Sequence, residues 1–166
     1  MKKITLKQVN KIIAALGGKT EIVIKGLVDR ISEEQPALFE YLRKADSRFN
    51  KKESELLITT AVMGWHIVKE ELGCSAEIYE AFIERYYLAN LALFDPKLVQ
   101  DARRKENSPP EILSKFNKQP ELMEFLARLI FDHCKFSYGP LRIKNLFPML
   151  MNLKTFMDCI VLFQTE

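Results

Sequence analysis

Residues 50–73 decide the fold class, and they read NKKESELLITTAVMGWHIVKEELG. Asn50 followed three residues later by Glu53 is a relative of the capping box that begins α-helices. Gly73 supplies the residue type at which helices commonly end. Between these signals, apolar residues occupy nearly every side of the predicted helix. The narrow polar strip that remains contains Glu55, Thr59, His66 and Glu70. Helices of this kind lie in the middle of a helical array, where other helices cover them.

The same start and stop signals recur on both sides of this stretch. A capping residue or a first-turn proline precedes each predicted helix. These residues are Thr5, Thr20, Pro36, Ser75, Pro109, Pro120 and Pro148. No segment alternates apolar and polar residues between hairpin turns, as strands would. We therefore predict an all-α fold, a compact array of about seven to nine helices. Its two central helices, 57–72 and 76–94, are apolar nearly all round.

The length and composition of the chain suit one folded domain. It has 166 residues, of which 48% are hydrophobic, enough to bury a substantial core. The most polar stretch is residues 101–110, which we expect to be the most exposed connection. We therefore predict a single helical domain over residues 1–166.

The charge and cysteine content argue against several classes of protein. The net charge is only +3, with 25 basic and 22 acidic residues, which disfavours a dedicated nucleic-acid-binding domain. Three cysteines with unrelated spacings predict neither a disulfide framework nor a zinc site. There is no H-E-x-x-H motif and no Glu-x-x-His pair, so we expect no metal and no cofactor.

The distribution of apolar residues predicts no membrane insertion. The amino terminus is basic, but an amphipathic stretch follows it instead of the apolar core of a signal peptide. Leu146–Phe163 is the most apolar run of the chain. Four residues interrupt it: Pro148, Asn152, Lys154 and Asp158. A membrane-spanning helix needs about 20 predominantly apolar residues. We expect a cytoplasmic protein.

The two histidines are candidate functional residues. His66 lies in the polar strip of the 57–72 helix with Glu70 four residues on, which is typical of a surface pair. His133 falls in the middle of the apolar face of a helix that begins at Pro120, and a buried imidazole needs hydrogen-bond partners. A backbone carbonyl or a tyrosine hydroxyl is the usual partner. The alternative is a ligand-binding pocket.

The 76–94 helix offers polar groups for such a pocket. Tyr86 and Asn90 share its apolar side, where polar tips on an apolar wall are typical both of ligand sites and of ordinary cores. The ligand-binding hypothesis therefore names His133, Tyr86 and Asn90. A catalytic pair between His133 and Cys134 is excluded because adjacent helical residues point about 100° apart.

Residues 10–28 admit a helix-turn-helix interpretation. The small residue, turn glycine and core positions of that motif fall on Ala14, Gly18, Ile24 and Leu27. Nucleic-acid contacts would then involve Lys19, Thr20 and Lys25. Too few basic residues lie on the would-be recognition face for strong phosphate binding.

The C-terminal helix, 148–163, carries three methionines among leucine, isoleucine and phenylalanine. Methionines suit adaptable partner surfaces, and they also fill irregular cores. Packing in the protein's own core and packing across a homodimer interface explain this helix equally well.

One short similarity occurs within the chain. Residues 35–42 read QPALFEYL and residues 119–126 read QPELMEFL. Duplication of a unit of about 80 residues would explain the match. The shared chemistry of proline-initiated helices would also explain it. The second explanation is favoured because the flanking residues do not continue the match.

Taken together, these patterns predict a non-enzymatic helical module that binds a protein partner or associates with itself, with the 148–163 helix as the candidate surface. One alternative is a DNA-binding regulator that uses residues 10–28. The other is a small-ligand-binding protein or enzyme with a pocket near His133.

Overall fold

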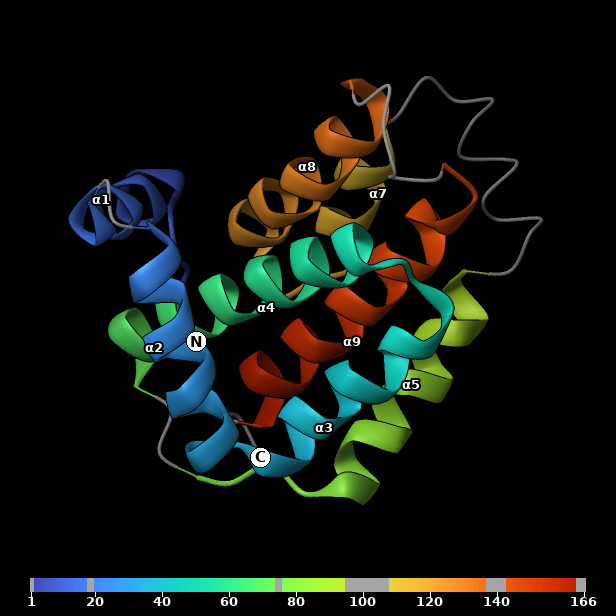
Figure 1. Ribbon diagram of the computed structural model, residues 1–166, viewed down its shortest axis with the longest axis horizontal. Coiled ribbons are helices and arrows are strands. Elements are labelled where there is room, and N and C mark those ends of the chain that lie inside the picture. The colour runs from blue at the N-terminus through green and yellow to red at the C-terminus, as the bar shows by residue number, and fades with distance from the viewer. Residues whose placement is uncertain (1, 18–19, 74–75, 95–107, 137–142, 164–166) are drawn as a thin grey trace.

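The computed structural model describes residues 2–17, 20–73, 76–94, 108–136 and 143–163. Within these ranges the chain forms eight α-helices, two short 3-10 helices and no strand (Figure 1). The α-helices are α1 (Leu6–Leu16), α2 (Thr20–Glu34), α3 (Pro36–Ala45), α4 (Lys51–Leu72), α5 (Glu80–Leu93), α7 (Pro109–Lys115), α8 (Pro120–Phe136) and α9 (Leu146–Phe163). The 3-10 helices are η1 (Asp46–Arg48) and η2 (Ile143–Asn145). The prediction of a compact all-α array is confirmed.

The helix ends follow the capping signals in the sequence. The Asn50 side chain accepts the backbone N–H of Glu53, and the Glu53 carboxylate accepts the N–H of Asn50. Thr5 begins α1 with the same reciprocal arrangement. Gly17 and Gly73 end α1 and α4 with φ angles of 67° and 71°, a backbone region that favours glycine. These boundaries are local in origin, because each depends on residues within one helical turn.

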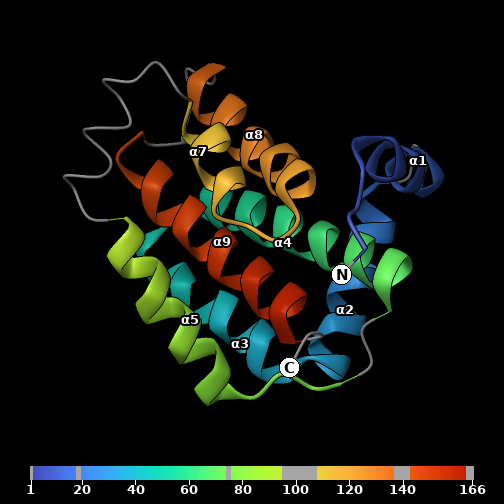
Figure 2. The same cartoon turned by 180° about the vertical axis from the view of Figure 1, so that it is seen from behind.

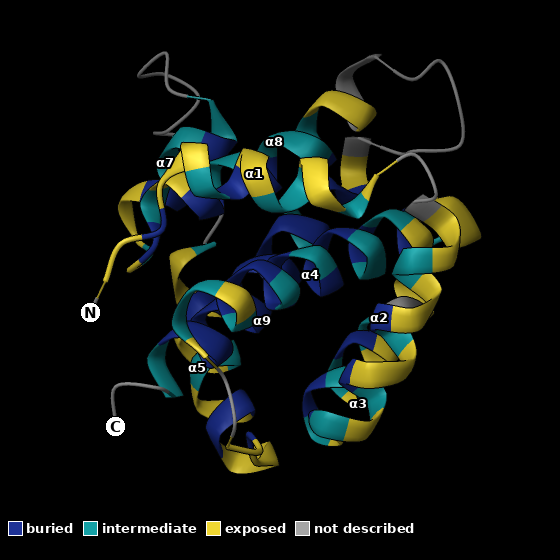
Figure 3. Cartoon of the chain, turned by 90° about the vertical axis from the view of Figure 1, so that its left-hand side faces the viewer, coloured by how far each residue is buried: buried dark blue, intermediate teal, exposed yellow. Residues whose placement is uncertain are grey.

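Helices α4 and α9 form the centre of the array. They lie side by side in the middle of the molecule in both views (Figure 1, Figure 2), and both are largely buried (Figure 3). Gly64 lies where α4 meets α9. A Cβ atom there would lie 2.6 Å from Sδ of Met157 on α9 and 2.7 Å from Cδ1 of Leu126 on α8. The missing side chain therefore allows the three helices to approach closely.

The other helices pack around this central pair. Helix α9 contacts α3, α5 and α8 as well as α4. Helix α2 packs on α3 and α4, α7 packs on α8, and α1 packs on α8. By length and hydropathy α9 could cross a membrane, but 78% of its residues are buried inside the fold, which is the position of a core helix.

The structure corrects the predicted identity of the second central helix. Helix α4 occupies the central position that its sequence predicted, whereas the 76–94 segment does not, because one side of α5 is exposed. The partner of α4 in the centre is α9. Periodicity measures how wide an apolar face is, but it does not say which helices cover that face.

Two predicted helix starts are also corrected. Ser75 was expected to begin a helix through Tyr79, but residues 76–78 are not helical and α5 begins at Glu80. Pro148 was expected to begin the last helix, which instead starts two residues earlier at Leu146. Most of the predicted exposed connection, residues 101–107, lies outside the described residues.

Candidate functional site

Asn90, one of the three residues proposed for ligand binding, lies on the inner side of α5. It is 2% exposed, and its side-chain amide donates to Thr155 Oγ1 at 3.2 Å and to Asp158 Oδ2 at 2.9 Å. Both acceptors belong to α9. Asn90 thus faces inward, and its partners are side chains of the protein itself.

Asp158 is the centre of a buried polar cluster. Besides the bond from Asn90, its carboxylate accepts a bond of 2.8 Å from Asn117 Nδ2 and one of 2.6 Å from Lys154 Nζ. Burial raises the pKa of the Asp158 carboxyl, while the charge of Lys154 and the three hydrogen bonds act in the opposite direction. The side chains of Asn90, Asn117 and Lys154 therefore take the place of water as hydrogen-bond donors to this carboxylate.

This cluster fastens three parts of the fold together. Asn90 comes from α5, Asn117 from the connection between α7 and α8, and Lys154 with Asp158 from α9. A satisfied buried network of this kind favours one packing arrangement over its alternatives. Sequence reasoning missed its role, although a signal was present. Lys154 and Asp158 are an oppositely charged pair four residues apart inside the most apolar run of the chain.

His133 is exposed, so the predicted burial of its imidazole is wrong. Ile130, one turn earlier on the same face of α8, is 0% exposed. Nδ1 of His133 lies 2.6 Å from the carbonyl oxygen of Leu129, one turn earlier in the same helix. A backbone carbonyl is thus its partner, as the structural interpretation of this residue expected.

Tyr86 is half-buried and belongs to an aromatic cluster. The ring centroid of Tyr86 lies 4.8 Å from that of Phe82, and the guanidinium of Arg85 lies 5.6 Å from the Tyr86 ring centroid. The three residues of the ligand hypothesis therefore have three different sets of partners. A pocket that joins His133, Tyr86 and Asn90 stays a prediction.

His66 is more buried than a surface pair implies. Its side chain is 13% exposed, and Nδ1 lies 3.9 Å from Glu70 Oε1. Burial lowers the pKa of the imidazole, while the Glu70 carboxylate raises it by a smaller amount. The predicted pairing with Glu70 is present.

The helix-turn-helix interpretation falls on α1, α2 and their connection. Lys19 lies outside the described residues, Thr20 is the first residue of α2, and Lys25 is exposed. The two helices have different packing partners, since α1 contacts α8 whereas α2 contacts α3 and α4. In helix-turn-helix proteins the second helix presents its amino-terminal residues to the major groove. DNA binding by this segment stays a prediction.

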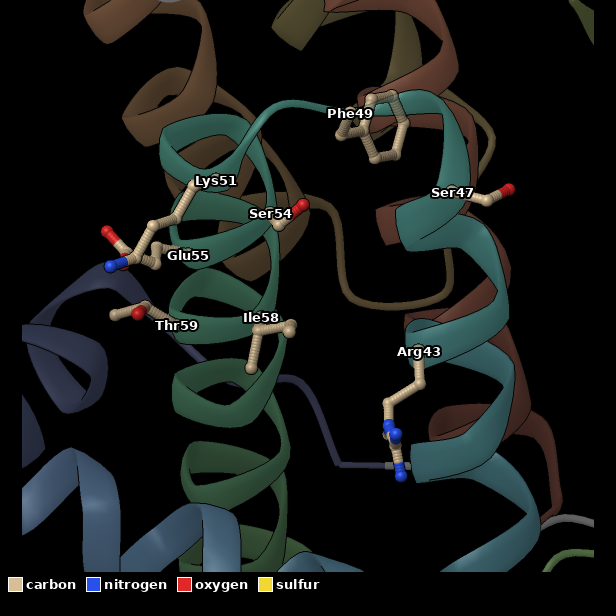
Figure 4. Close-up of a pocket in the computed structure, with 8 residues that line it drawn as sticks. All are labelled: Arg43, Ser47, Phe49, Lys51, Ser54, Glu55, Ile58 and Thr59. Carbon is tan, nitrogen blue, oxygen red and sulfur yellow. The ribbon is translucent and has the colours of Figure 1, made fainter.

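An open cleft of about 780 Å³ lies between α3 and α4. Figure 4 shows Arg43 reaching from α3 toward the side of α4 that carries Ser54 and Ile58. The lining is mostly polar and comprises Arg43, Ser47, Phe49, Lys51, Ser54, Glu55, Ile58 and Thr59. Neither histidine contributes to it. Sequence reasoning did not identify this cleft, because its two walls come from separate helices.

The outer side of α5 is unusually apolar for a surface. Leu88 and Leu91 are 57% and 47% exposed, and Ala81 and Ala92 lie on the same exposed side. We define the α5 outer face as Ala81, Glu84, Arg85, Leu88, Leu91 and Ala92, all of which are exposed. Helix α5 therefore buries an asparagine and exposes leucines.

The predicted association surface on the C-terminal helix is corrected. Every residue from Met149 to Val161 is buried among the chain's own helices, so in this fold their side chains are not accessible to a partner. Of the two explanations for the methionines, packing in the protein's own core is the one that the structure supports.

Among the described residues, no group of three or more histidine, cysteine, aspartate or glutamate side chains is arranged to hold a metal ion. In comparisons with known proteins, no family model, no curated protein sequence and no solved structure matches this chain.

Proposed function

We propose that this protein is a non-enzymatic helical module that associates with a second copy of itself through the α5 outer face. The observation that carries the proposal is the orientation of α5. Its inner side buries Asn90, which is 2% exposed, while Leu88 on the opposite side is 57% exposed. The inner side also buries Phe82 and Ile83, so α5 carries large apolar side chains on its outer as well as its inner side.

The exposed leucines favour a partner on energetic grounds. Burying a leucine side chain stabilises a protein by about 1.5–3 kcal/mol relative to leaving it exposed. Leu88 and Leu91 lie three residues apart, on the same side of the helix, with Ala92 beside them. A contiguous apolar surface on a helix is typical of an interaction site.

The charges of the α5 outer face favour a second copy as the partner. The face carries one acid, Glu84, and one base, Arg85, both one turn before Leu88. In a two-fold contact each copy presents the same surface to the other. An antiparallel pairing centred on Leu88 buries the leucines and leaves the balanced charges at the rim, as in other interfaces with an apolar centre.

Sedimentation equilibrium of the full chain tests this proposal. We expect a monomer–dimer equilibrium for the wild type, and a monomer for Leu88→Glu and for Leu91→Glu. Both positions are exposed, so the variants should keep the melting temperature of the monomer fold. Ile22→Glu is the matched control, because Ile22 is 74% exposed on α2, and it should dimerise as the wild type does. A wild type that stays monomeric at high concentration, or a Leu88→Glu variant that dimerises normally, would contradict the proposal.

A second candidate function is binding of a small anionic ligand in the cleft between α3 and α4. The observation that favours it is the lining of the open cleft, to which Arg43 and Lys51 bring positive charges and Glu55 one negative charge. Arg43 supplies the orienting charge. Inorganic phosphate should shift the NMR resonances of Ser54 and Ile58 in the wild type but not in Arg43→Ala. Equal shifts in both proteins, or none, would exclude Arg43 as a ligand-binding group.

A further inference from the structure

Two buried glutamines hold two separate segments of the chain in the same way. Gln119 Oε1 accepts the backbone N–H of Ile4 at 2.8 Å, and Gln119 Nε2 donates to the carbonyl of Lys2 at 2.8 Å. Gln35 Oε1 accepts the backbone N–H of Ile78 at 2.9 Å, and Gln35 Nε2 donates to the carbonyl of Ala76 at 2.8 Å. Each amide therefore binds the N–H of one residue and the C=O of the residue two positions earlier. We name these arrangements the Gln119 clamp and the Gln35 clamp.

The surroundings of the two clamps match in several further respects. Each glutamine is at most 2% exposed, and each precedes the proline that begins a helix. The clamped isoleucines, Ile4 and Ile78, are 1% and 0% exposed.

The helices that follow the clamped isoleucines also begin alike. In both cases the next residue is the N-cap, and the N-cap backbone angles nearly coincide. They are φ −87° and ψ 155° at Thr5, and φ −93° and ψ 157° at Tyr79. A hydrogen-bond pattern, two burial states and a helix start thus agree at both places. Extended backbone angles are usual at an N-cap, and Asn50 and Ser108 have them too. Helix-start chemistry does not explain the paired hydrogen bonds from each buried glutamine to a distant segment.

Among the described residues, the order of elements after each clamped isoleucine is also the same. From Ile4 the chain forms α1, α2, the Gln35 helix α3, the 3-10 helix η1 and the long central helix α4. From Ile78 it forms α5, then, after the undescribed stretch 95–107, α7, the Gln119 helix α8, the 3-10 helix η2 and the long central helix α9. Five of the eight residues in 35–42 and 119–126 are identical.

Part of the helix packing follows the same correspondence, although the contacts of α9 with α5 and α8 and of α2 with α4 have no counterpart of similar extent in the described part of the chain. If α3 corresponds to α8 and α4 to α9, the contact of α3 with α9 corresponds to the contact of α8 with α4, and both are present. Likewise, α1 packs on α8 and α5 packs on α3. Exchanging the two halves replaces α4 by α9 and α9 by α4, so the central contact between them is unchanged, as is expected of a contact on a two-fold axis.

We propose that the chain is a fused dimer: two copies of one ancestral helical unit, residues 2–73 and 76–163, each holding the leading segment of the other through one buried glutamine. Gln35 of the first half binds Ile78 of the second half. Ile4 of the first half binds Gln119 of the second half. The similarity between residues 35–42 and 119–126 is therefore the remnant of a duplication, contrary to the explanation that the sequence alone favoured. This inference is independent of the α5 outer face.

The test uses the full chain with a protease site placed between Gly73 and Ala76. After cleavage, both halves remain present, and each clamp consists of hydrogen bonds between residues of different halves. We expect the cut protein to stay a one-to-one complex. Gln35→Ala and Gln119→Ala should each raise the dissociation constant of the halves at least tenfold, by similar factors. Gln8→Ala is the matched control, because Gln8 bonds to Thr5 and Glu71 within its own half, and it should leave the dissociation constant unchanged.

Hydrogen exchange in the uncut protein provides a second measurement that needs no dissociation. Gln119→Ala should remove the protection of the Ile4 amide and leave that of Ile78, and Gln35→Ala should do the reverse. Separation of the wild-type halves on cleavage would overturn the proposal. The proposal would also be overturned if Gln35→Ala or Gln119→Ala left the dissociation constant of the halves unchanged, as Gln8→Ala should, because the two clamps would then not be equivalent.

Discussion

Lys154 Nζ lies 2.6 Å from Asp158 Oδ2, and both side chains are buried, one turn apart on the central helix α9. A charge pair inside a core is sensitive to the loss of one partner, since the remaining charge is then buried without compensation. Asp158 has further donors in Asn90 and Asn117, whereas Lys154 has Asp158 as its ion-pair partner.

Removing the charge of Asp158 should therefore destabilise the protein strongly. We expect Asp158→Asn to lower the free energy of unfolding by about 3–5 kcal/mol, because Lys154 keeps an uncompensated charge. The double variant Lys154→Met/Asp158→Asn should recover most of this loss, because no charge then remains in the cluster. Urea unfolding, followed by the fluorescence of the single, fully buried Trp65, measures both. If the double variant is no more stable than Asp158→Asn, the uncompensated charge of Lys154 is not the cause of the lost stability.

The burial of His66 makes stability depend on pH. Its folded-state pKa is lowered by burial from an ordinary value of 6.5, so the unfolded chain binds the proton first as pH falls. The free energy of unfolding should decrease from about pH 6.5 down to the folded-state pKa and not change further below it. His66→Gln should flatten this part of the profile. Glu70→Gln should steepen it, since the carboxylate that raises the pKa is lost. Urea midpoints over a pH series measure the slopes, and an unchanged slope in His66→Gln would contradict the assignment.

Two helical glycines should respond differently to alanine. Gly26 on α2 is exposed, and a Cβ there has no atom within 4 Å. Gly26→Ala should raise the free energy of unfolding by about 0.5–1 kcal/mol through helix propensity. At Gly64 the same gain is opposed by contacts with Met157 and Leu126, and overpacking costs about 1–3 kcal/mol. We expect Gly26→Ala to be the more stable variant by about 2 kcal/mol in urea unfolding. Equal stabilities would mean that α4 and α9 do not meet closely at Gly64.

The thiol of Cys159 should be inert in the folded protein. Burial raises the pKa of Cys159, so the reactive thiolate is scarce at ordinary pH. In a Cys74→Ser/Cys134→Ser background, iodoacetamide should leave Cys159 unmodified in buffer and alkylate it in urea, as read by mass spectrometry. Rapid alkylation of the native protein would place α9 at the surface instead of the centre.

The parts of the fold that depend on neighbouring residues were predictable. The capping pairs at Thr5 and Asn50, the glycine at Gly73 and the prolines Pro36 and Pro120 all mark helix ends in the structure. Each signal works within one or two turns of helix, so the sequence contains the whole interaction.

The parts that depend on distant residues were not predictable. Residues 76–78 stay out of α5 because Gln35, more than 40 positions away, binds their backbone. His133 is exposed although Ile130 on the same face of α8 is buried, a difference that depends on neighbouring helices and not on the pattern of α8. The inward direction of Asn90 was predictable from its helical face, but its partner Asp158 was not.

The distance along the chain between the partners of each clamp has a consequence for protein synthesis. Ile78 is made 43 residues after Gln35, whereas Ile4 waits for Gln119, which is made 115 residues after it. On the ribosome, the Ile4 segment therefore has no binding site until Gln119 has been made, and the long loop that its docking closes makes this a late event. Residues 2–5 and α1 therefore dock on α8 only after Gln119 has been made, and a nascent chain stalled before Gln119 leaves Ile4 without its partner.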